Sequence, residues 1–304
     1  MGVSIQEIIR EFQLTVCNEG DPDLLVTENE LNRCGLQLAG FYGYFGQKRI
    51  QILGNAETSY FQSLSPAKKA KAAKTLLSHE IPCVIVTHGN TVPIEIQKAS
   101  KKYHRWLLAT NTSTSLLNVN LTSYLLHELA ETMNYHGVLL DVFGVGVLIT
   151  GKSGIGKSET ALALIKNGHL LIADDNVVIK KPSPDTLVGT GSELTKHLLE
   201  IRGIGILDIK SLFGLQAIRL QKSIEMVIHL EPWDEETYYD RIGDAYQYRE
   251  IMGVQIPEII VPVRTGRNLA VIIEIAALNY RQNVMGYNTA KLLDERIKSL
   301  SQGL

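Results

Sequence analysis

The chain has 304 residues, enough for two domains, and its 45% hydrophobic and 20% charged residues are typical of a water-soluble globular protein. A formal net charge of −2 excludes the large basic surface of proteins that bind nucleic acid or anionic membranes, so neither partner is expected. The apolar runs 145–150 and 269–278 are too short to cross a bilayer, and no secretory signal pattern is visible at the N-terminus. Three scattered cysteines indicate neither a disulfide framework nor a metal site, so we expect a cytoplasmic protein.

Predicted helices and strands alternate in the N-terminal part. Residues 4–13 have the spacing of an amphipathic helix, and residues 48–53 alternate like a strand. A helix begins at Ser65-Pro66, with serine as cap and proline in the first turn, and a short apolar strand follows at 82–86. This alternation predicts a small α/β domain over residues 1–130, whose role the sequence does not reveal.

The second half is expected to form a separate domain, residues 131–304. Residues 123–133 contain neither glycine nor proline, and they are predicted to form a helix that leads into it. Two apolar segments, 136–142 and 145–150, then follow, separated only by Phe143-Gly144. So short a link favours an antiparallel pair of strands.

Residues 151–158, GKSGIGKS, match the phosphate-binding pattern G-x-x-x-x-G-K-[ST]. A predicted strand precedes them and a predicted helix follows, as the motif requires. The glycines allow backbone N–H groups to face phosphate oxygens, the lysine offers charge to the β- and γ-phosphates of ATP, and the serine hydroxyl can bind Mg²⁺. The residues expected to hold the nucleotide are Gly151, Lys152, Ser153, Gly154, Ile155, Gly156, Lys157 and Ser158. Because a hairpin leads into this loop instead of a parallel βαβ unit, we expect a mixed sheet.

An acidic pair, Asp174-Asp175, ends an apolar segment shortly after the predicted P-loop helix. A carboxylate at that place can bind Mg²⁺ or accept the proton of a hydroxyl nucleophile. Adjacent side chains of an extended chain point in different directions, so the two carboxylates can have separate roles. The pair followed by Asn176 would also suit an ordinary turn, but the P-loop just upstream favours the functional interpretation.

Four segments now occur in order, and together they resemble the HPr kinase/phosphorylase family. They are HGVLLDVFGVGVLITGKSGIGKSETALALI, LIADD, HLLEIRGIGILDIKSLFG and VPVRTGRNLAVIIEIAALN. The resemblance implies ATP-dependent phosphorylation of a serine in the phosphocarrier protein HPr. It also implies removal of that phosphate by phosphorolysis, which consumes inorganic phosphate and releases pyrophosphate. A C-terminal kinase domain similar to that of phosphoenolpyruvate carboxykinase, a homohexamer, a role in carbon metabolism and, in many members, a response to fructose 1,6-bisphosphate are further implications.

The resemblance also implies roles for single residues. Asp175 is expected to be the general base of the kinase reaction and to return the proton in phosphorolysis, with Asp174 as the alternative base or as its partner. His136 is expected beside Asp175, where it modulates the carboxylate or contacts phosphate. Glu200 is expected to bind Mg²⁺ together with Ser158, although without the resemblance it would pass for an exposed charge on a helix.

Four arginines complete the set of expected site residues: Arg202, Arg241, Arg264 and Arg267. Guanidinium groups suit a phosphoryl group in transit, and the resemblance links the loop 262–267 to dephosphorylation. The simpler alternative is that Arg264 and Arg267 form surface ion pairs with Glu258 or Glu274.

Two other functions fit a P-loop protein of this kind. A kinase for a small metabolite would need a lid and a concave polar pocket, whereas a protein kinase needs an open rim. A non-catalytic nucleotide-binding regulator would have lost Lys157 or the acidic pair, and both are present.

Overall fold

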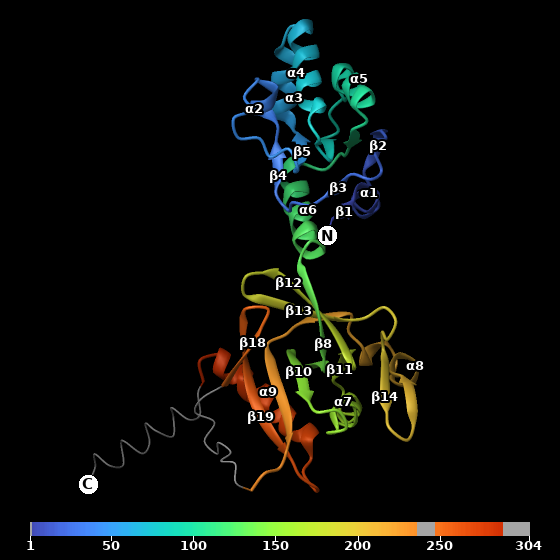
Figure 1. The fold of residues 1–304 in the computed structure, drawn as a ribbon, viewed down its shortest axis with the longest axis vertical. Helices are drawn as coiled ribbons and strands as arrows, with labels where there is room; N and C mark the ends of the chain where they lie inside the picture. The colour runs from blue at the N-terminus through green and yellow to red at the C-terminus, as the bar shows by residue number, and fades with distance from the viewer. Residues whose placement is uncertain (1, 236–246, 288–304) are drawn as a thin grey trace, which may run out of the picture. The chain divides into compact units, whose positions relative to one another are not determined.

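The computed structural model describes residues 2–235 and 247–287. The chain divides into two compact units, residues 1–130 and 131–304, each with its own hydrophobic clusters (Figure 1). No described helix has both the length and the apolar character that a membrane span requires.

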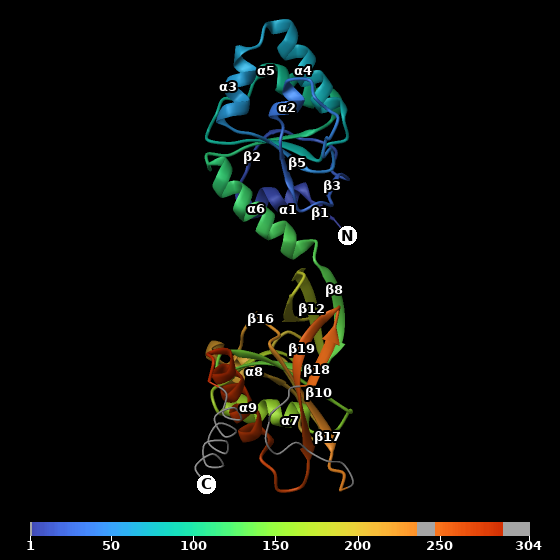
Figure 2. The same ribbon diagram turned by 90° about the vertical axis from the view of Figure 1, so that its left-hand side faces the viewer.

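The first unit is a five-stranded sheet with helices on both faces, in the strand order β2-β7-β6-β5-β4. Four strands are parallel and β2 lies antiparallel at one edge. Two of the six helices, α1 and α6, pack on one face, and the other four pack on the opposite face (Figure 2). The predicted α/β domain is therefore present.

The strands of the five-stranded sheet are β2 (Thr15–Asn18), β4 (Leu31–Arg33), β5 (Ile50–Leu53), β6 (Cys83–Val86) and β7 (Trp106–Ala109), and β1 (Val3–Ser4) pairs separately with β3 (Leu25–Val26). The helices are α1 (Ile5–Phe12), α2 (Gly35–Leu38), α3 (Asn55–Ser63), α4 (Pro66–Ser78), α5 (Ile94–Tyr103) and α6 (Thr114–Glu128).

The predicted helix over residues 123–133 is wrong at its C-terminal end. Helix α6 ends at Glu128, and Glu131–His136 form strand β8 of the second unit. This strand pairs antiparallel with β12 (Asn176–Ser183), from Glu131 opposite Lys181 to His136 opposite Asn176. A sheet partner 40 to 50 residues away outweighs the local helical pattern, because it pairs the backbone groups of the strand.

The second unit is built on a six-stranded mixed sheet, in the order β11-β9-β10-β17-β19-β18. Strands β10, β17 and β19 are parallel, whereas β9 runs antiparallel to both β10 and β11, and β18 runs antiparallel to β19. The predicted hairpin and the predicted mixed sheet are thus confirmed. Phe143 and Gly144 both have positive φ, 51° and 84°, as a two-residue hairpin turn requires. The strands are β9 (Val138–Val142), β10 (Val145–Gly151), β11 (Leu170–Ala173), β17 (Met226–Pro232), β18 (Gln247–Ile251) and β19 (Val254–Val263).

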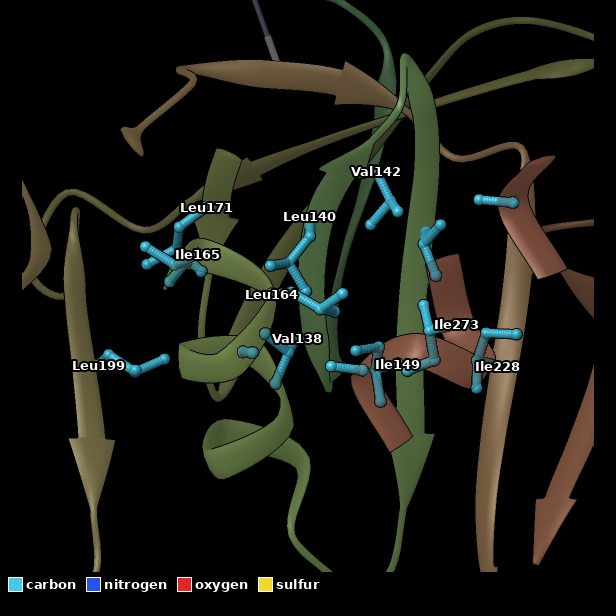
Figure 3. Close-up of a cluster of buried hydrophobic side chains, with 14 of the residues drawn as sticks. Val138, Leu140, Val142, Ile149, Leu164, Ile165, Leu171, Leu199, Ile228 and Ile273 are labelled. Carbon is cyan, nitrogen blue, oxygen red and sulfur yellow. The ribbon is translucent and has the colours of Figure 1, made fainter. Parts of the chain in front are cut away.

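Both faces of this sheet are covered. Helices α7 (Lys157–Lys166) and α9 (Leu269–Val284) bury side chains such as Leu164 and Ile273 against Ile149 and Ile228 (Figure 3). Each such fully buried side chain contributes about 1.5–3 kcal/mol to folding. A four-stranded sheet, β16-β13-β12-β8, packs on the opposite face through a second cluster. The remaining elements are β13 (Thr186–Gly191), β14 (Leu198–Ile201), β15 (Gly205–Asp208), α8 (Ile209–Phe213), η1 (Leu215–Ala217) and β16 (Gln221–Ser223).

Candidate active site

The phosphate-binding loop connects the end of β10 to the start of α7, as predicted. Gly151 and Gly156 have φ of 139° and 103°, values that residues with a side chain rarely adopt. Because Gly156 caps α7 without a side chain, the first-turn N–H groups remain available to an anion. The Lys157 side chain is 7% exposed and its Nζ donates to the backbone oxygens of Gly151 and Lys152, at 3.0 and 3.3 Å. The lysine charge is therefore held against the loop itself.

Asp174 connects the phosphate-binding loop to the end of β11 and to strand β14. It follows β11 directly, and its carboxylate accepts hydrogen bonds from the Ser158 hydroxyl and from the Glu200 backbone N–H, both at 3.1 Å. Its side chain is only 5% exposed, and this burial raises the pKa of Asp174, although the hydrogen bonds from Glu200 and Ser158 act in the opposite direction. Asp174 is thus a buried acceptor at the first turn of the P-loop helix.

Asp175 differs from Asp174 in its exposure, its partner and its backbone conformation. Its side chain is 73% exposed, and Oδ1 lies 3.0 Å from Nδ1 of His136, which stands at the end of β8. The same ring nitrogen lies 3.1 Å from the backbone oxygen of Asp175, so Nδ1 carries the proton in this arrangement. Asp175 has φ of 65°, a left-handed conformation that is uncommon for a side-chain-bearing residue and that occurs often at functional sites.

Glu200 lies on strand β14, so the alternative of an exposed charge on a helix is wrong about the helix, although the residue is exposed. Leu199 and Ile201 are buried on one side of β14, and Glu200 is exposed on the other, as the twofold alternation of a strand requires. The turn between β14 and β15 brings Arg202 to the phosphate-binding loop, where Nη2 donates to the Ser153 hydroxyl at 2.9 Å. The hairpin 198–208 therefore contacts the loop at one point and Asp174 at another.

The oxygen donors near α7 fit Mg²⁺. They are the Ser158 hydroxyl and the Asp174 carboxylate bonded to it. Glu200 meets Asp174 through its backbone N–H, and its side chain is exposed on the other side of β14. Hard oxygen ligands suit this ion, which keeps several waters and substrate phosphates in its shell. No group of three or more histidine, cysteine or acidic residues capable of enclosing a metal exists within residues 2–235 and 247–287. Sequence reasoning named Ser158 and Glu200 but did not place Asp174 between them.

The two C-terminal arginines lie in the loop after β19, and their suggested pairing with glutamates is wrong for the described residues. Glu258 pairs with Arg249 at 2.6 Å, and Glu274 pairs with His169 at 2.9 Å. Arg267 instead donates from Nη1 to the Pro262 oxygen at 3.0 Å, within its own loop.

The guanidinium carbon of Arg264 lies 5.5 Å from the ring centroid of Trp233, a contact that no motif indicated. Arg241, the remaining predicted site residue, lies outside the described residues.

Comparison with known proteins extends over nearly the whole chain. Residues 3–125 match the family model described as HPr Serine kinase N terminus, and residues 127–297 match HPr Serine kinase C-terminal domain. Proteins named HPr kinase/phosphorylase from Caldicellulosiruptor bescii and Alkaliphilus metalliredigens are 46% and 44% identical, over 99% of this chain and 97% and 98% of their own. A solved structure described as Hpr(Ser) kinase/phosphatase from Coxiella burnetii is 34% identical, covers 53% of this chain and 98% of its own, and has a TM-score of 0.48.

Proposed function

This chain belongs to the HPr kinase/phosphorylase family, and we propose that it phosphorylates a serine of the phosphocarrier protein HPr with ATP and removes the same phosphate by phosphorolysis. It is an enzyme with kinase activity, and the small-metabolite kinase considered above has no support in its relatives.

The observation that best supports the proposal is the separation of the acidic pair. Asp174 is buried and bonded to Ser158, whereas Asp175 is exposed and contacts His136. A base for a protein substrate must reach a hydroxyl that enters from solvent, so the exposed carboxylate suits this role. A residue that positions a phosphate-bound cation must stay fixed beside the P-loop, which suits the buried one.

In the kinase direction, Asp175 takes the proton from the HPr serine as its oxygen attacks the γ-phosphorus of ATP, and ADP leaves. Lys157, Arg202 and Arg241 balance the charge on the phosphoryl oxygens. In phosphorolysis an oxygen of inorganic phosphate attacks the phosphoserine phosphorus, and the bond from phosphorus to the serine oxygen breaks. Asp175 then returns a proton to that oxygen, and pyrophosphate is released. His136 fixes the orientation of the Asp175 carboxylate in both directions.

Ser158, Asp174 and Glu200 would hold Mg²⁺, which when bound neutralises negative charge on the β- and γ-phosphate oxygens. Asp174 keeps the Ser158 hydroxyl oriented, and the Glu200 backbone N–H keeps Asp174 in place. We further infer a cytoplasmic homohexamer involved in carbon metabolism, with fructose 1,6-bisphosphate as the effector to test first. These inferences depend on the family resemblance.

One reaction series tests the function. Purified HPr is incubated with this protein, Mg²⁺ and γ-labelled ATP, and after ATP is removed, inorganic phosphate is added and pyrophosphate is measured. HPr with its acceptor serine changed to alanine is the control. We expect serine-dependent labelling followed by phosphate-dependent loss of label and equimolar pyrophosphate. Labelling of the alanine variant, or release of free phosphate instead of pyrophosphate, would refute the proposal.

A further inference from the structure

Three parallel strands of the main sheet end at the edge that carries the phosphate-binding loop. Gly151, the last residue of β10, is paired with Leu230 of β17, and Leu230 is paired with Val261 of β19. The segments that follow these strands therefore leave the sheet side by side. They are the phosphate-binding loop after β10, Trp233 after β17 and Arg264 after β19, with Trp233 in the middle.

The backbone fixes Trp233 next to the arginine loop. The last paired residues of β17 and β19 are Pro232 and Val263. Trp233 adds one hydrogen bond beyond this pair, from its N–H to the Val263 oxygen at 3.1 Å. Trp233 and Arg264 are each the first residue after that pair, so the starting points of both side chains are set by the sheet and not by a free loop.

The side chains make contact as well. The guanidinium carbon of Arg264 lies 5.5 Å from the ring centroid of Trp233, and the indole is the aromatic group that binds a cation best. A guanidinium that lies over a ring keeps the N–H groups at its edge free to donate. In the part of the chain that the structure describes, Arg264 makes no ion pair, whereas the guanidinium of Arg267 is bonded to Pro262.

We propose that Trp233 is a positioning residue for phosphorolysis: its indole holds the Arg264 guanidinium at the sheet edge that carries the phosphate-binding loop, ready to bind the entering phosphate. Trp233 is 39% exposed, so it can support a side chain at the rim without closing the site. A long arginine side chain otherwise samples many rotamers, and restricting them before phosphate arrives lowers the cost of binding. The inference rests on the proposed function, because it assumes that Arg264 serves the reverse reaction.

The test is a double-mutant cycle on the full-length protein. Trp233→Leu removes the aromatic face, Trp233→Phe keeps a weaker one, and Arg264→Ala removes the cation. Tyr44→Leu, which changes an 83% exposed aromatic residue of the first unit, is the matched control. Both kinase and phosphorolysis rates are measured, with KM for phosphate and for ATP, and melting temperatures monitor folding.

We expect Trp233→Leu to raise KM for phosphate about two- to fivefold, the range that a cation–π contact at an exposed site supplies. KM for ATP should stay unchanged. Trp233→Phe should raise KM for phosphate much less than Trp233→Leu does. In the Arg264→Ala background, Trp233→Leu should have no further effect.

An equal loss from Trp233→Leu with and without Arg264 would overturn the positioning role, since the indole would then act independently. A raised KM for ATP would do the same, because it would indicate a contact with the nucleotide. If the unmodified protein releases no pyrophosphate from phosphorylated HPr, the proposed function itself fails and takes this role with it. If Arg264→Ala leaves phosphorolysis intact in an otherwise active enzyme, only the inference about this loop fails.

Discussion

Asparagine substitutions at the two positions of the acidic pair should have different consequences: Asp175→Asn should mainly lower activity, and Asp174→Asn should mainly raise stability. The two substitutions are isosteric and remove one charge each, from side chains that are 5% exposed at Asp174 and 73% exposed at Asp175. Asparagine also tolerates the left-handed backbone of residue 175. The two variants therefore form a matched test of how burial of a carboxylate in this site affects stability and activity.

Asp175→Asn should cost little stability and most of the activity. The contact with His136 is largely exposed, and even charged pairs in such positions contribute only about 0–1 kcal/mol. Loss of a general base lowers the rate by about 10²–10⁴. At 1.36 kcal/mol for each factor of ten, this corresponds to about 3–5 kcal/mol of lost transition-state stabilisation. His136 keeps its second partner, the backbone oxygen of residue 175, so the ring stays in place.

Asp174→Asn should instead stabilise the protein in the absence of ligands. Weakening its hydrogen bonds from Ser158 and Glu200 costs about 1 kcal/mol each. Burial raises the pKa of Asp174 in spite of those bonds. The desolvation of the charged carboxylate therefore destabilises the folded protein more than its hydrogen bonds stabilise it. The raised pKa means that the folded protein binds a proton that the unfolded chain releases. The free energy of unfolding therefore falls as pH rises from about 3.9, the ordinary aspartate value, through the raised pKa, and then levels off.

The assays are thermal denaturation across pH, with and without Mg²⁺, and single-turnover phosphorylation of HPr. At neutral pH Asp174→Asn should melt higher than the unmodified protein, and the difference should vanish in acid. Mg²⁺ with ATP should stabilise the unmodified protein more than this variant, whose Mg²⁺ requirement should increase. If Asp175→Asn phosphorylates HPr at the normal rate while Asp174→Asn does not at saturating Mg²⁺, Asp174 is the base and our assignment is wrong.

Two further predictions concern the site, and a third concerns the assembly that the family resemblance implies. Lys157→Ala should lower the kinase rate by about 10²–10³, because the charge that stabilises the phosphate oxygens is lost. Lys166→Ala, at the exposed end of the same helix, is the control and should not lower the rate. Normal turnover in a folded Lys157→Ala variant would refute the role of Lys157. Arg264→Ala and Arg267→Ala should reduce phosphorolysis more than phosphorylation, because the reverse reaction brings in an additional anion, and equal losses measured in one preparation would contradict this. Light scattering should detect an assembly of hexamer size, and particles of monomer size at working concentration would exclude it.

The features that sequence reasoning predicted correctly depend on neighbours in the chain. The phosphate-binding loop needs a strand before it and a helix after it, and all three are contiguous. The hairpin at Phe143-Gly144 is equally local, since a two-residue link leaves antiparallel pairing as the simplest arrangement. Helix α1 carries a complete capping box between Ser4 and Glu7, which confirms the helix expected near the N-terminus.

The features that were missed depend on partners far along the chain. Residues 131–133 have helical character, but their backbone pairs with β12. Glu200 resembles a solvated helix residue until β15 is placed beside β14, which makes both segments strands. The contact between Trp233 and Arg264 arises because β17 and β19 are neighbours, although the two residues are 31 positions apart in the sequence. Spacing alone gives no sign of such pairings.

The same long-range dependence explains why adjacent aspartates differ so much. Asp174 is buried and accepts the Glu200 N–H of β14, whereas the Asp175 side chain is exposed and contacts His136 of β8. The turn of the same hairpin contacts the phosphate-binding loop through Arg202 and Ser153. A displacement of this hairpin would therefore break the Glu200 bond to Asp174 and the Arg202 bond to Ser153 together. The long signature 197–214 thus links the buried Asp174 to the phosphate-binding loop, while the Asp175 side chain stays exposed beside it.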